Sequence, residues 1–79
     1  MGKSDLKKSF AVVLKELRKE SGLSQKELGD YSNVERVYIS RLERGLQLPS
    51  LDVIFRIAEV LKLKPSEFIQ RLERKHKIS

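Results

Sequence analysis

Apolar residues recur along this chain at the spacing that places them on one face of an α-helix. In the first segment, Phe10, Val13, Leu14 and Leu17 follow the i, i+3, i+4, i+7 pattern. Comparable stripes recur further along, and Gly or Pro residues separate them. The pattern therefore predicts an all-α chain, with helices over about residues 5–21, 25–31, 36–44, 51–62 and 65–75.

Capping residues support these boundaries. Ser4 or Asp5 is expected to cap the first helix, and Ser24-Gln25-Lys26-Glu27 has the form of a capping box. Gly22 and Asn33 follow predicted helix ends, where a left-handed residue is often needed. Lys64 is a poor cap for a helix beginning at Pro65, so we expect that helix to fray. Residues 76–79 then form a tail in which His76 is solvated.

The last two predicted helices carry more apolar residues than one core requires. We expect Leu51, Ile54, Ile57, Ala58 and Leu61 of the fourth helix to be buried, with Phe68, Ile69 and Leu72 of the fifth. The remaining apolar surface, with Leu46 and Leu48 beside it, indicates a second subunit. The predicted dimer-interface residues are Phe55, Val60, Phe68 and Ile69. The alternative is that the fifth helix covers this surface within one chain.

The two short helices between residues 25 and 44 have the spacing of a helix-turn-helix. Leu28, Val34, Ile39 and Leu42 are placed to separate two helices at a steep angle. Gly29 costs about 1 kcal/mol relative to Ala inside a helix. We therefore expect the absence of a Cβ at Gly29 to permit a close approach between backbones.

A helical wheel predicts that the third helix has a basic outer face. Ile39 and Leu42 lie on its inner side, and the outer side comprises Arg36, Val37, Ser40, Arg41 and Arg44. An Arg guanidinium matches guanine O6 and N7 as well as phosphate oxygens, and a helix fits the major groove. A merely solvated basic face is the alternative, which the preceding helix-turn-helix spacing disfavours.

Composition and net charge narrow the range of possible functions. The 79 residues suit one domain spanning 1–79. The net charge of +6 favours a polyanionic partner, and nucleic acid is the leading class of such partners. With no Cys and one His, we expect no disulfide, metal site or cofactor. No enzyme motif and no small-molecule sensor are evident. No apolar run approaches the ~20 residues of a membrane span, so we expect a cytoplasmic protein with no membrane partner.

Between residues 10 and 72 the chain resembles the Cro/lambda-repressor, or XRE-type, helix-turn-helix regulators. The segments GLSQKEL and YISRLERG, with the Pro-Ser that precedes the fourth helix, are together specific to that family. The resemblance implies a compact five-helix lambda-repressor-like domain that binds a palindromic double-stranded DNA operator as a homodimer. Among subfamilies, restriction-modification controllers and small phage or chromosomal repressors are the most similar.

The resemblance also implies roles for individual residues. Arg18 and Glu43 match a partly buried structural salt bridge, so neither is expected to read bases. Glu35 departs from the usual Ser or Thr at the cap of the recognition helix. A carboxylate there can accept a hydrogen bond from cytosine N4, but it also repels nearby phosphates. Residues implied to meet base edges are Arg36, Val37, Ser40 and Arg41, and those implied to meet phosphates are Gln25, Lys26, Tyr38 and Arg44.

A protein-interaction module or antitoxin using the same fold is the main alternative. Its basic face would then meet an acidic protein in place of DNA. Salt dependence distinguishes the two, because DNA binding releases condensed counterions and weakens steeply as salt rises.

Overall fold

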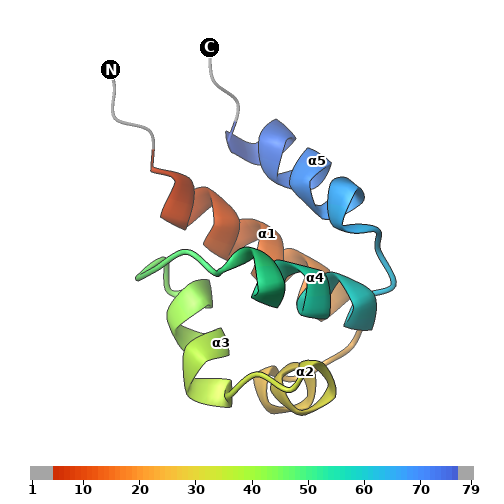
Figure 1. The fold of residues 1–79 in the computed structure, drawn as a ribbon. Coiled ribbons are helices and arrows are strands. Elements are labelled where there is room, and N and C mark those ends of the chain that lie inside the picture. Colours follow the sequence, from red (N-terminus) through yellow and green to blue (C-terminus); the bar gives the residue numbers. More distant parts are fainter. Residues whose placement is uncertain (1–4, 77–79) are drawn as a thin grey trace.

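The computed structural model describes residues 5–76, and all its regular structure is helical (Figure 1). Each predicted helix is confirmed, with ends that differ from the expected ones by no more than two residues. Ser4 and residues 77–79 of the predicted tail lie outside the described residues. The helices are α1 (Leu6–Glu20), α2 (Gln25–Ser32), α3 (Arg36–Glu43), α4 (Leu51–Val60) and α5 (Pro65–His76).

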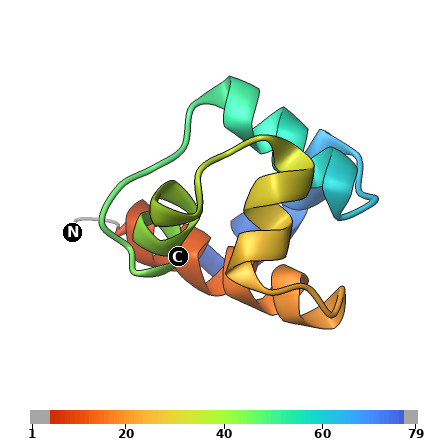
Figure 2. The same cartoon turned by 90° about the horizontal axis from the view of Figure 1, so that it is seen from below.

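The longer helices α1 and α5 lie side by side at one end of the molecule, and α2 and α3 form the other end (Figure 1). Helix α4 lies between these two ends and packs against both α2 and α5. In the view from below, α2 and α3 are the helices closest to the viewer, and they meet at a steep angle across a short turn (Figure 2). The helix-turn-helix is therefore presented on one side, away from α5.

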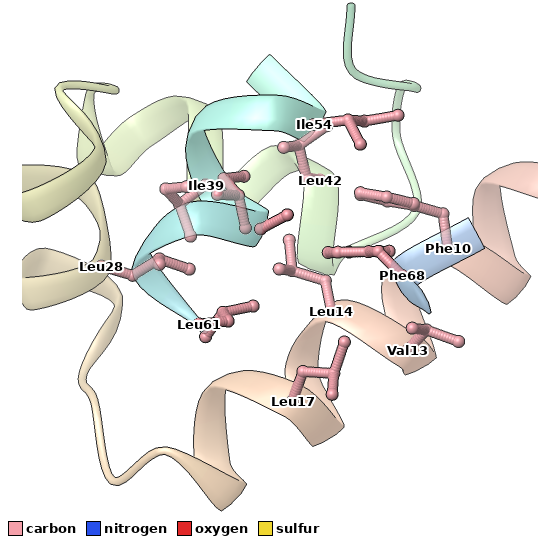
Figure 3. Packing of buried hydrophobic residues seen from close by; sticks show 12 residues of the cluster. Phe10, Val13, Leu14, Leu17, Leu28, Ile39, Leu42, Ile54, Leu61 and Phe68 are labelled. Carbon is pink, nitrogen blue, oxygen red and sulfur yellow. The ribbon is translucent and has the colours of Figure 1, made fainter. Parts of the chain in front are cut away.

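All five helices contribute to a single apolar core (Figure 3). Phe10 of α1 and Phe68 of α5 stack with ring centroids 5.5 Å apart and planes inclined by 13°. Leu28 of α2 and Ile39 of α3 are completely buried in the same cluster. Because the two short helices are anchored in this core, their mutual angle is set by packing as well as by the turn.

Three expectations for α4 and α5 are wrong. Phe68 is completely buried against Phe10, so it is a core residue and offers no side chain to a second subunit. Leu51 was expected in the core but is 70% exposed, because the α4 side chains that pack against the core begin at Val53 and Ile54. Ile69 was expected to face inward and is instead exposed.

The end of α4 and the cap of α5 also differ from expectation. Lys62 adopts φ +62°, and the Leu63 N–H donates to the Ala58 carbonyl at 2.9 Å, so α4 ends before the predicted residue 62. At the start of α5, the Lys64 N–H donates to the Glu67 carboxylate at 2.7 Å. That bond supplies part of the cap that the Lys64 side chain does not.

His76 belongs to α5 and is not a solvated tail residue. It is half-buried, and its Nδ1 lies 2.8 Å from the Ser9 hydroxyl of α1. This correction follows from the packing of α5 along α1, which holds its last turn against the first turns of α1.

Candidate nucleic-acid interface

Helix α2 begins with the predicted capping box. The Glu27 N–H donates to the Ser24 hydroxyl at 3.0 Å, and the Ser24 N–H donates to the Glu27 carboxylate at 2.9 Å. The capping box does not use the N–H groups of Gln25 and Lys26 in the first turn of α2, where no preceding helical carbonyl is available. The start of α2 therefore presents donors and the positive end of a helix dipole.

The turn between α2 and α3 is as tight as the position of Gly29 predicts. A Cβ on Gly29 would lie 2.5 Å from the carbonyl oxygen of Val34, a contact that the backbone cannot relieve easily. The Val34 N–H donates to the Gly29 carbonyl at 2.9 Å. Asn33 adopts the expected left-handed conformation, with φ 60° and ψ 44°. Both predictions for this turn are confirmed.

Arg56 of α4 also holds this turn, and sequence reasoning missed it. Its Nη1 donates to the Asn33 carbonyl at 3.2 Å, and its Nη2 pairs with Asp52 at 2.9 Å. No local pattern indicates this contact, because its acceptor is a backbone carbonyl from a distant segment.

The two faces of α3 differ as the helical wheel predicts. Ile39 and Leu42 are completely buried. Val37 is 57% exposed, so its apolar side chain is available to a partner. Arg36, Arg41 and Arg44 are also exposed, whereas Tyr38 and Ser40 are half-buried. Tyr38 packs against the core, so only part of its side chain faces solvent.

Glu43 lies on the inner side of α3 and pairs with Arg18 of α1. Arg18 Nε donates to one carboxylate oxygen at 2.6 Å, and Nη2 donates to the other at 2.9 Å. The third nitrogen, Nη1, donates to the Leu23 carbonyl at 2.8 Å. The hydrogen bond to Glu43 raises the pKa of Arg18 above its usual value. The ion pair that the resemblance implied is therefore present, and it is bidentate.

Gln25 joins this pair. Its side-chain Nε2 donates to Glu43 Oε1 at 3.0 Å, which ties the first residue of α2 to the carboxylate on α3. Sequence reasoning assigned Gln25 to a phosphate and did not find this bond, since the two residues are 18 positions apart. One of its two amide hydrogens remains for another acceptor.

Lys26 and Arg36 bring positive charge to the starts of both short helices. Lys26 is exposed and pairs with Asp30 at 2.9 Å. This hydrogen bond raises the pKa of Lys26, and the charge of Arg36 opposes the rise. The two cations therefore act on one region of the surface.

Neither a metal site nor a membrane-spanning helix is found in residues 5–76. Within that range no three acidic, His or Cys side chains gather where they might hold a metal ion. None of the helices described there is long and apolar enough to cross a membrane.

Comparison with known proteins identifies the family. The family pattern described as Helix-turn-helix matches residues 14–68. The HTH-type transcriptional regulator y4dJ of Sinorhizobium fredii is 31% identical over 65 residues, which cover 82% of this chain and 84% of that protein.

Two solved structures extend this similarity to the fold. The restriction-modification controller protein C.AhdI of Aeromonas hydrophila is 38% identical, with a TM-score of 0.76 over 84% of this chain and 98% of that one. The controller C.Esp1396I, solved as a tetramer on its natural 35-base-pair operator, is 28% identical, with a TM-score of 0.83 over 94% and 97%. The chain belongs to the helix-turn-helix family of the Cro and lambda-repressor type, whose members are DNA-binding transcriptional regulators and not enzymes.

Proposed function

We propose that this protein binds a two-fold-symmetric operator as a homodimer, with α3 in the major groove, and so regulates transcription. One observation carries the proposal: α3 buries one face in the core and presents Arg36, Arg41 and exposed Val37 on the other. A rigid helix with bidentate donors and an apolar side chain has the groups needed to read base edges. The operator complex of C.Esp1396I supports this use of the fold.

Base reading falls to the outward side chains of α3. In this proposal Arg36 and Arg41 donate to guanine, Val37 contacts a thymine methyl group, and Ser40 lies beside them at the edge of the groove. These four residues lie within one 8-residue helix, so they would read a few adjacent base pairs.

In this proposal the phosphate ligands lie at the start of α2, on α3 and at the C-cap of α3. Gln25 and Lys26 stand at the start of α2, where free N–H groups and the helix dipole favour an anion. Tyr38 and Arg44 are the other proposed phosphate ligands. Since Gln25 is already held by Glu43, its remaining donor is oriented before DNA arrives.

The proposed dimer face lies on α4 and α5. Phe55 is 56% exposed, Leu51 is 70% exposed and Ile69 is 39% exposed, while Val60 is half-buried. In this proposal Leu51, one turn before Phe55 on α4, joins the face, and buried Phe68 leaves it. Two subunits would read two half-sites, and this multiplies the specificity of one small module.

The similarity to C.AhdI and C.Esp1396I supports a restriction-modification controller, with a small phage or chromosomal repressor as the alternative. We expect such a protein to act in the cytoplasm, where the operator DNA is. A protein-interaction module or antitoxin remains the competing function, because its basic face would look the same.

Selection of bound duplexes from a random DNA pool tests the proposal. We expect a two-fold-related consensus, and fluorescence anisotropy on that consensus should show affinity falling steeply with salt. Arg36→Ala should weaken binding. Arg74→Ala is the matched control, because Arg74 is an exposed residue of α5, the helix at the other end of the molecule from α2 and α3 (Figure 1). No consensus from the wild-type protein, together with a shallow salt dependence, would favour the interaction module.

A further inference from the structure

Residues 24–45 hold as many acidic as basic side chains. The cations are Lys26, Arg36, Arg41 and Arg44, and the acids are Glu27, Asp30, Glu35 and Glu43. The segment proposed to meet DNA is thus neutral, although the whole chain carries +6. Each carboxylate near a phosphate backbone weakens binding to DNA. The presence of each of these four acidic residues therefore needs a physical explanation.

Structural contacts account for three of the four acids. Glu27 caps the Ser24 N–H at 2.9 Å. Asp30 pairs with Lys26 across one helical turn at 2.9 Å. Glu43 is buried against Arg18 and Gln25. All three carboxylates are therefore used within the protein.

Glu35 is the remaining acid, and its position differs from the others. It is exposed at the N-cap of α3, yet its side chain makes no capping hydrogen bond. Within residues 5–76 we find no ion pair of its carboxylate either. Its neighbour along the chain is Arg36, the first residue of α3. The carboxylate thus stands free at the end of the helix that bears the base-reading side chains.

We infer that Glu35 is a specificity-determining residue, whose carboxylate accepts a hydrogen bond from the exocyclic amine of a cytosine or adenine beside the base pair that Arg36 reads. This inference rests on the proposed operator function. In the major groove only those two bases offer a donor, through cytosine N4 or adenine N6. An ionised carboxylate has acceptors alone, so it is satisfied by these bases and repelled by the acceptor atoms of guanine and thymine.

The same carboxylate makes binding to other sequences unfavourable. On a site without a matching amine, Glu35 is desolvated or brought near phosphates without compensation. Its presence therefore lowers non-specific affinity while one preferred base restores binding at the operator. Removing the Glu35 carboxylate should therefore raise the affinity for non-specific DNA and erase the preference for one base at the operator.

The test compares sequence selection by the full chain with selection by Glu35→Ala and Glu35→Gln. Glu73→Ala is the matched control, since Glu73 is an exposed glutamate on α5. We expect the wild-type protein to select cytosine or adenine at one position, and the identity of that base distinguishes the two amines. Glu35→Ala should lose this preference by roughly ten- to hundredfold and keep the rest of the consensus. Glu35→Gln should shift the position toward adenine, which an amide binds with both its groups.

Affinity for random duplex DNA gives an independent readout. Glu35→Ala should bind it several-fold more tightly at low salt, to a greater extent than Glu73→Ala does. A wild-type consensus that Glu35→Ala leaves unchanged overturns the role of Glu35 and leaves the operator function standing. If the wild-type protein selects no consensus, the operator function itself fails, and this inference fails with it.

Discussion

The guanidinium of Arg18 and the carboxylate of Glu43 face each other in two hydrogen bonds of 2.6 and 2.9 Å that join α1 to α3. The Arg18 side chain is 11% exposed and the Glu43 side chain 1%. Glu43 therefore belongs to the recognition helix by sequence but to the core by position. It fixes the inner side of α3 and has no route to a base edge.

We predict that Glu43→Ala destabilises the fold. Loss of the carboxylate leaves the Arg18 guanidinium and the Gln25 amide without their acceptor, a change that costs about 3 kcal/mol or more where a charge is buried. For a domain of this size the midpoint of thermal unfolding should fall by more than about 10 °C. Arg18→Ala should behave alike, and the double variant should lose less than the sum.

An exposed pair provides the control for that experiment. Glu20 and Arg71 also join two helices, at 3.2 Å, but their side chains are 61% and 33% exposed. Glu20→Ala should cost less than about 1 kcal/mol. An unchanged midpoint for Glu43→Ala accompanied by loss of DNA binding would mean that Glu43 is a contact residue after all.

Gln25→Ala should affect stability as well as DNA binding. Its hydrogen bond to the Glu43 carboxylate is worth about 1.5–3 kcal/mol when the charge is desolvated, and less for this half-buried side chain. We expect a modest fall in the midpoint and weaker binding to specific and non-specific DNA alike. Urea unfolding and anisotropy on both DNAs measure the two effects, with exposed Gln70→Ala of α5 as control. A loss of affinity without any loss of stability would show that the Gln25–Glu43 bond contributes little.

Arg36→Ala or Arg41→Ala should weaken specific binding by about 1–3 kcal/mol and relax the preference at one base pair, because a bidentate donor is lost. Selection experiments with each variant, alongside Arg74→Ala, measure the change. If the selected consensus stayed the same with either variant, that residue would be a phosphate ligand and not a base reader.

Gly29→Ala should destabilise the protein although Ala is the better helix former. The added Cβ would meet the Val34 carbonyl at 2.5 Å, so the turn between α2 and α3 must move. Such overpacking typically costs about 1–3 kcal/mol, which exceeds the gain in helix propensity of about 1 kcal/mol. Chemical unfolding measures the balance, and a stabilised variant would show that the turn yields at little cost.

Phe55→Lys should convert the proposed dimer to a monomer, because it places a charge in the exposed apolar face of α4. Sedimentation measures the change, and Val12→Lys is the control, since Val12 is 43% exposed on α1. We expect the operator half-sites to be centred about 10 base pairs apart or a small multiple of this. A wild-type protein that saturates a single half-site as a monomer would contradict both statements.

The sequence by itself determined the helices and the turn that joins α2 to α3. These features are local: the apolar stripe through Phe10 and Leu14, the capping box at Ser24, and a residue at Asn33 that tolerates a left-handed backbone all act within a few positions. The outward face of α3 followed for the same reason, because helical periodicity relates Arg36 and Arg41 to Ile39 without knowledge of the rest of the chain.

Only the tertiary structure decided which apolar and polar side chains meet across the molecule. Helical periodicity allows Phe68 and Ile69 to share one wide apolar stripe. Packing against Phe10 buries Phe68 and leaves Ile69 exposed. The bond from Gln25 to Glu43 likewise depends on the angle between α2 and α3. Local patterns state which side of a helix is apolar, whereas these contacts depend on how closely helices approach, and that is set by the shape of the whole core.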